Sequence, residues 1–266
     1  MTQIYANPSY GSGRFRRRIR LRASEHSMLA ELEDEVHGFR SHLEHDGKRL
    51  LSIKGEALRY PINLCPGATE PLRQLEGMPI DTYAGDINRM IDPTHQCTHL
   101  FDLSILALGH CHAGAGEWVY DMVVEDEADE QPADACISLN GTEILRWTVL
   151  NWSVQQPADL AGNTLSKGFA AWAGQYYDGR EQMAAFALQK AYFVAFARRF
   201  EMERFAGQPI AQLNHMHNQC FSHQESRIER ARRRHHVSKD FSHDDSELLR
   251  FVDAGPHTTA ENTDIQ

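Results

Sequence analysis

Residues 92–112 have the sequence DPTHQCTHLFDLSILALGHCH, and this stretch decides the predicted fold. Asp92 followed by Pro93 is typical of a helix N-terminus, because the aspartate can accept from free backbone N–H groups and proline needs no hydrogen bond there. Gly109 favours a helix end beside it. Apolar side chains cover most of the circumference in between, so we expect one helix over residues 93–108, buried on nearly all sides.

The predicted helix carries one polar stripe. His95, His99 and Asp102 follow one another at the spacing i, i+4 and i+7, which places them on a single helix face. Titratable side chains on an otherwise apolar helix need partners or must change their pKa. We therefore expect the functional site of the protein on this stripe.

Composition narrows the class of protein. The chain has 266 residues, of which 41% are hydrophobic and 24% charged, as in one large globular domain. A net charge of −10 argues against nucleic acid as a partner, and no apolar run is long enough for a membrane span. Five scattered cysteines without a Cys-x-x-Cys pair are typical of reduced thiols, so we expect a cytoplasmic protein. The expected partner is a small molecule.

The N-terminal part alternates in the manner of β-strands. Residues 14–23 place Phe15 and other apolar side chains on one face and five arginines on the other. The next strand, over residues 28–36, places glutamates opposite its apolar face, which predicts a ladder of charge pairs between the strands. The same alternation puts Asp34 on the apolar side, where a carboxylate is costly unless it is hydrogen-bonded or catalytic.

Strand and helix patterns further along complete the predicted fold. The turn signals Asp46-Gly47 and Asn140-Gly141 each join two strands. We expect further strands and then helices at 50–60, 117–125, 135–139 and 142–154, and at 166–175, 180–205 and 214–234. This is an α+β fold: a curved antiparallel sheet packed on a buried central helix, with C-terminal helices covering it. Residues 1–13 are predicted to be a flexible arm, 14–237 a single domain, and 238–266 a polar mobile tail.

Acid–base chemistry is the leading interpretation of the site. His99 is the candidate general base or acid, Asp102 its orienting carboxylate, and Asp34 or His37 the second proton-transfer group. The candidate substrate-binding residues are Arg59, Tyr60, Cys97 and Tyr120, the first two to polarise a substrate oxygen. Because the chain lacks a glycine-rich nucleotide loop and a serine elbow, we expect no organic cofactor.

Two other interpretations remain open at this point. His95, His99 and Asp102 have the spacing of a metal site, so a hydrolase that uses a divalent metal such as zinc is one alternative. The other is a non-catalytic, dimeric binding protein whose polar stripe is a buried structural network. A homo-oligomer is expected in either case.

The chain also resembles a known family. Residues 17–23 (RRIRLRA), 30–34 (AELED), 65–68 (CPGA) and 96–103 (QCTHLFDL) resemble a bacterial family of unknown function over about 14–237, with Cys-Thr-His-Leu as the most specific motif. That resemblance implies no established chemistry. A looser similarity is to cofactor-free lyases of bacterial aromatic catabolism, which release formaldehyde from lignin-derived dimers. It implies a lyase or isomerase acting on a hydrophobic, aromatic small molecule.

Overall fold

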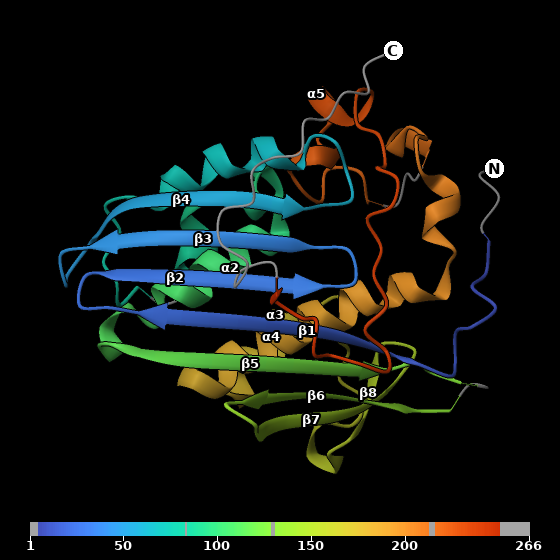
Figure 1. Cartoon of the computed structure of the whole chain (residues 1–266). Helices are drawn as coiled ribbons and strands as arrows, with labels where there is room; N and C mark the ends of the chain where they lie inside the picture. Colours follow the sequence, from blue (N-terminus) through green and yellow to red (C-terminus); the bar gives the residue numbers. More distant parts are fainter. Residues whose placement is uncertain (1–4, 83, 129–130, 213–215, 251–266) are drawn as a thin grey trace.

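The computed structural model describes residues 5–82, 84–128, 131–212 and 216–250, and its centre is one antiparallel sheet of eight strands. The strands follow the order β4-β3-β2-β1-β5-β6-β7-β8 (Figure 1). Their bounds are β1 Arg14–Ala23, β2 Ser27–Asp34, β3 Gly38–His45, β4 Leu50–Arg59, β5 Gly116–Glu125, β6 Ala133–Leu139, β7 Thr142–Leu150 and β8 Ser153–Gln156. The fold is therefore α+β, as the sequence predicts.

The predicted alternation and charge ladder are both present in the first strands. Phe15, Ile19 and Leu21 of β1 are buried on the inner face. On the outer face, Glu31 of β2 accepts from Arg20 at 3.1 Å and from Arg22 at 3.2 Å. An arginine face next to a glutamate face is thus neutralised within the sheet, without an external anion.

The turns follow the local sequence. Asn140 and Gly141 adopt positive φ values of 49° and 80°, the backbone that a tight two-residue hairpin between β6 and β7 requires. In the pairing of β3 with β4 the register shifts between Gly38 and Phe39, so a bulge lies next to the turn that carries His37. This irregular turn places the ring of His37 against His99 of the central helix.

Helices cover the inner face of the sheet (Figure 1). α2 packs on β2 and β3, and α4 packs on β1 and on β5 to β7. The α-helices are α1 Ala84–Met90, α2 Thr98–Leu108, α3 Phe169–Tyr176, α4 Gly179–Ala195 and α5 Glu225–Ile228. The 3₁₀ helices are η1 Cys65–Leu75, η2 Pro93–His95, η3 Cys111–Ala113, η4 Ala158–Leu160, η5 Phe196–Arg199, η6 Met202–Phe205, η7 Ile210–Gln212 and η9 Phe221–His223. The helices of the described part fall short of the length and hydrophobicity that crossing a bilayer requires.

The predicted helix over 93–108 is interrupted, which corrects the sequence analysis. Gln96 is extended, with φ −101° and ψ 165°, and separates η2 from α2. Its carbonyl accepts from Phe221 N at 2.9 Å, and its side-chain amide donates to the carbonyl of Pro71 at 3.2 Å. These tertiary hydrogen bonds replace the helical ones, so His95 leaves the face that carries His99.

The C-terminal helices are shorter than predicted. α4 ends at Ala195 instead of extending to residue 205, because the chain then turns through η5 and bridges Ala6 at Phe200. The helix predicted over 214–234 is wrong in its described part: there only α5 is an α-helix, and Ile62 and Pro209 bridge the arginines at 233 and 232. Residues 214 and 215 lie outside the described residues.

Residues 238–250 pack on the outer face of the sheet, although the sequence predicts a mobile tail from 238. Lys239 N donates to the carbonyl of Glu35 at 2.7 Å, and Leu249 N donates to Glu33 at 2.6 Å. In Figure 1 this segment, coloured red, crosses the front of the sheet, opposite α2 and α4. Residues 251–266 of the predicted tail and 1–4 of the predicted arm lie outside the described residues.

Gly55 of β4 permits the close approach of η1 and α2 to the sheet. A Cβ atom at this position would lie 2.7 Å from Cδ1 of Leu72 and 2.9 Å from Cδ2 of Leu100, and both leucines are fully buried. We predict that Gly55→Ala lowers the free energy of unfolding by about 1–3 kcal/mol, as overpacking does. Urea unfolding measures the change, and exposed Lys54→Ala on the same strand is the control, expected within about 0.5 kcal/mol of wild type. An unchanged Gly55→Ala variant would contradict this packing.

Candidate functional site

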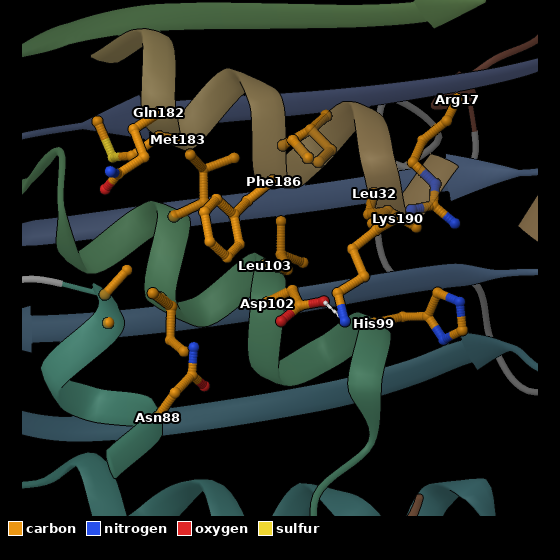
Figure 2. A pocket seen from close by; sticks show the side chains of 16 residues that line it. Arg17, Leu32, Asn88, His99, Asp102, Leu103, Gln182, Met183, Phe186 and Lys190 are labelled. Carbon is orange, nitrogen blue, oxygen red and sulfur yellow. Dashed lines mark ion pairs between the residues drawn. The ribbon is translucent and has the colours of Figure 1, made fainter. Parts of the chain in front are cut away.

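A cavity of about 80 Å³ lies between α1, α2, α4 and the inner face of β1 and β2 (Figure 2). Its apolar walls come mainly from α2 and α4. The polar and charged side chains that line it are Arg17, Asn88, His99, Asp102, Gln182 and Lys190. In Figure 2, Arg17, His99, Asp102 and Lys190 lie at one end and Asn88 and Gln182 at the other, with Leu103 and Phe186 between them. The cavity thus has a charged end and an apolar middle.

Asp34 is the buried anion behind the charged end. The β1–β2 register places Asp34 directly opposite Arg17, whose Nη2 lies 2.6 Å and Nε 3.0 Å from Oδ2. Both side chains are at most 3% exposed. The backbone N–H groups of Val36 and His37 donate to Oδ1 at 2.9 Å. Burial opposes ionisation, but His37 and Arg17 outweigh it and hold the pKa of Asp34 well below its usual range, so the carboxylate is charged.

His37 connects Asp34 to the cavity. Its Nδ1 lies 3.0 Å from Oδ1 of Asp34, in the turn between β2 and β3. Its ring stacks on that of His99, with centroids 3.8 Å apart and planes inclined by 24°. Asp34, His37 and His99 therefore form a continuous row: Asp34 pairs with Arg17, and His99 lines the cavity.

His99 is the residue of this row that lines the cavity. It lies in the first turn of α2 and is half-buried. Burial, together with the nearby His37 and Arg17, lowers the pKa of His99 well below its usual value. The ring is consequently neutral at pH 7 and has a nitrogen lone pair available to accept a proton.

Asp102 pairs with Lys190 of α4 rather than with His99. Its Oδ2 is 3.6 Å from Nζ of Lys190, and the two side chains are 34% and 35% exposed. Burial raises the pKa of Asp102, against the opposing effect of Lys190 and Arg17. The carboxylate that supports the histidines is Asp34, through His37, whereas the sequence analysis assigned that role to Asp102.

Arg59 and Tyr60 lie outside the cavity. Arg59 donates to the carbonyls of Glu35 at 2.7 Å and Val237 at 2.8 Å, and to Glu33 at 2.9 Å. It thereby holds the turn that carries His37. Tyr60 lies under the guanidinium of Arg234, 4.3 Å from the ring centroid. Neither is among the described residues that line the cavity.

Cys97 and Tyr120 are buried elsewhere. Cys97 precedes α2, and burial raises the pKa of its thiol, which keeps it protonated and unreactive. The hydroxyl of Tyr120 lies 3.0 Å from Nε2 of His110, and burial raises its pKa to about 12. As with Arg59 and Tyr60, the described lining of the cavity includes neither residue.

The three predicted metal ligands are not brought together. His95 lies in η2 with its side chain 60% exposed, and its Nδ1 is 3.0 Å from Oδ2 of Asp92. His95, His99 and Asp102 would share one face only on a helix that is continuous through Gln96, and the helix is interrupted there. Within the described ranges, no group of three or more His, Cys, Asp and Glu side chains has the arrangement of a metal site.

Two positively charged side chains of the site, Arg17 and Lys190, were not predicted from the sequence. Arg17 is in phase with the inward-facing Phe15 and Ile19, and this alternation was the available signal. Lys190 follows Met183 and Phe186 on one face of α4, at spacings i, i+3 and i+7. The second signal is weaker, because helical spacing alone does not show which face meets the sheet.

A comparison with known families matches residues 16–111 to the family described as "Protein of unknown function (DUF2889)". The chain contains a DUF2889 domain. This domain includes Arg17, Asp34, His37, His99 and Asp102, whereas Lys190 lies beyond it. The predicted resemblance to a family of unknown function is thus confirmed over these residues. No curated protein matches the chain.

The buried pair within the DUF2889 domain gives a stability prediction. Arg17→Met leaves Asp34 buried without its cation, so we expect the free energy of unfolding at pH 7 to fall by about 3–5 kcal/mol. Arg14→Met, on the same strand but 42% exposed, is the control and should cost no more than about 1 kcal/mol. Urea unfolding measures both. Equal small losses would show that the Arg17–Asp34 pair is not essential to the fold.

The lowered pKa of His99 gives a pH prediction. Below pH 6.5 the unfolded chain binds a proton at this residue that the folded protein does not, so stability falls with pH until the lowered pKa is reached. We expect His99→Gln to make the loss of stability between pH 7 and pH 5.5 shallower, by up to about 1.4 kcal/mol per pH unit. His95→Gln, at an exposed position, should keep the wild-type slope. If both variants keep that slope, His99 is not held neutral by the fold.

Proposed function

We propose that this protein is a lyase or isomerase that works by acid–base chemistry, without an organic cofactor, on a hydrophobic, aromatic small molecule. The observation that carries the proposal is the placement of His99. A neutral imidazole lies at the charged end of an otherwise apolar cavity, and its stacking partner His37 is fixed by Asp34. Proton abstraction needs an unprotonated base held in a fixed position, and a histidine that is neutral at pH 7 provides one.

The proposed reaction begins with proton transfer to His99. For a substrate with a hydroxymethyl group, His99 takes the hydroxyl proton, the adjacent C–C bond breaks, and formaldehyde leaves. The carbon left with the electron pair then takes a proton back from the imidazolium. The atoms balance as R–CH₂OH giving R–H and formaldehyde, so no oxidant or reductant is required.

Two sets of charged residues favour these reaction steps. Arg17 and Lys190 line the cavity and stabilise negative charge that develops on the substrate. The carboxylate of Asp34 stabilises the imidazolium through His37, whose ring is in direct contact with that of His99. Together they lower the free energy of both charges in the transition state.

The size of the cavity limits what enters it. Apolar cavities of about 150 Å³ hold a benzene ring. At about 80 Å³, this cavity admits the reacting end of a substrate and leaves the remainder toward exposed Asn88. The apolar contacts of Leu103 and Phe186 favour an aromatic or aliphatic group next to the reacting carbon.

The test is turnover of a panel of aromatic compounds that carry a hydroxymethyl group, measured as formaldehyde released. We expect wild-type turnover of at least one member, a loss of about 100-fold or more in kcat for His99→Gln, and unchanged turnover for His95→Gln. Because the pKa of His99 is lowered, activity should stay level as the pH falls through 6.5. It should decline only when the pH approaches the lowered pKa of His99.

Other results would overturn the proposal. Equal loss in His95→Gln and His99→Gln, together with loss on addition of a chelator, would favour the metal-dependent hydrolase. Full activity of His99→Gln would remove the histidine from the mechanism. A folded wild-type protein that turns over no member would favour the non-catalytic binding protein.

A further inference from the structure

Asp102 and Lys190 form a loose ion pair at the charged end of the cavity. The distance of 3.6 Å from Oδ2 of Asp102 to Nζ of Lys190 is too long for a good hydrogen bond. Among the described residues, Oδ2 is buried and has no hydrogen-bond partner. A buried carboxylate oxygen without a hydrogen-bond donor is costly, so the arrangement favours an additional donor.

A hydroxyl group that lies beside this ion pair can form a hydrogen bond with both side chains. One oxygen can lie about 2.8 Å from both groups, donating its proton to the carboxylate and accepting from the ammonium. A methyl group or a bare aromatic C–H satisfies neither. A carboxylate ligand satisfies Lys190 but is repelled by Asp102, and an amine does the reverse.

We propose that Asp102 and Lys190 form a hydroxyl-binding clamp that selects substrates with a phenolic or alcoholic hydroxyl distinct from the group on which His99 acts. The inference rests on the proposed function for the identity of the cavity as a substrate site. The clamp implies a substrate class: a hydroxylated ring whose hydroxyl-bearing edge enters the cavity beside Leu103 and Phe186, which Figure 2 shows, with the rest of the molecule toward Asn88. Asp102 and Lys190 then determine which substrate is bound. Lys190 also stabilises negative charge on the substrate, but neither residue donates or removes a proton in the reaction.

The experiment compares phenol with toluene, which has a methyl group in place of the hydroxyl. Binding to the full-length protein is measured by NMR titration. We expect the wild-type protein to bind phenol at least tenfold more tightly than toluene, although toluene is the more hydrophobic. Asp102→Leu should abolish this preference, and Lys190→Met, which changes a partly exposed side chain, should reduce it about threefold or more.

Asp86→Leu is the matched control. It removes a carboxylate of α1 that is half-exposed and pairs with Arg89 outside the described lining of the cavity, so the preference for phenol should remain. His99→Gln should also keep the preference, because the clamp does not use the imidazole. Circular dichroism confirms that each variant is folded.

The outcomes separate this inference from the proposed function. Equal affinity of the wild-type protein for phenol and toluene overturns the clamp, even if His99-dependent turnover is found. A preference for phenol that survives both Asp102→Leu and Lys190→Met overturns it as well. A preference that these variants lose, in a protein without turnover, supports the clamp and contradicts only the proposed function.

Discussion

The fully buried carboxylate of Asp34 accepts from a guanidinium, an imidazole and two backbone N–H groups at once. A charge taken out of water is costly unless each of its lone pairs finds a donor. Here the donors come from β1 and from the turn between β2 and β3. Meeting this one requirement aligns two strands in register, orders an irregular turn and fixes the ring of His37.

The cavity depends on that constraint. Since His37 is fixed by Asp34, the ring of His99 stacks against a rigid surface at the start of α2. α4 then closes the other side and contributes Lys190 opposite Asp102. The site is therefore assembled from the sheet, a turn and two helices that are far apart in sequence. It contains two charge pairs: Arg17–Asp34, which is hydrogen-bonded, and Asp102–Lys190, which is 3.6 Å apart.

Much of the fold was predictable because it rests on local alternation. The strands around Phe15, the glutamates opposite the arginines and the turn at Asn140 all follow from period-two patterns and turn chemistry. The break at Gln96 was not predictable, since hydrogen bonds to Phe221 and Pro71 override a locally helical sequence. The same break removed His95 from the site. Arg59 and Tyr120 were chosen for their chemistry, but their polar atoms contact the carbonyls of Glu35 and Val237 and the ring of His110, outside the cavity.

The burial of Glu33 on the outer face of the sheet has a further consequence. Glu33 is fully buried beneath the segment that follows Val237, and it pairs with Lys239, 206 residues away in the sequence. Arg59 joins that segment to the turn that carries His37, because it donates to the carbonyls of both Val237 and Glu35. A chain shortened at residue 237 would hydrate Glu33 and loosen the support of His37 from behind. The residues after Val237 thus shield this end of the sheet from water, and tags or truncations there are expected to affect the cavity on the opposite face.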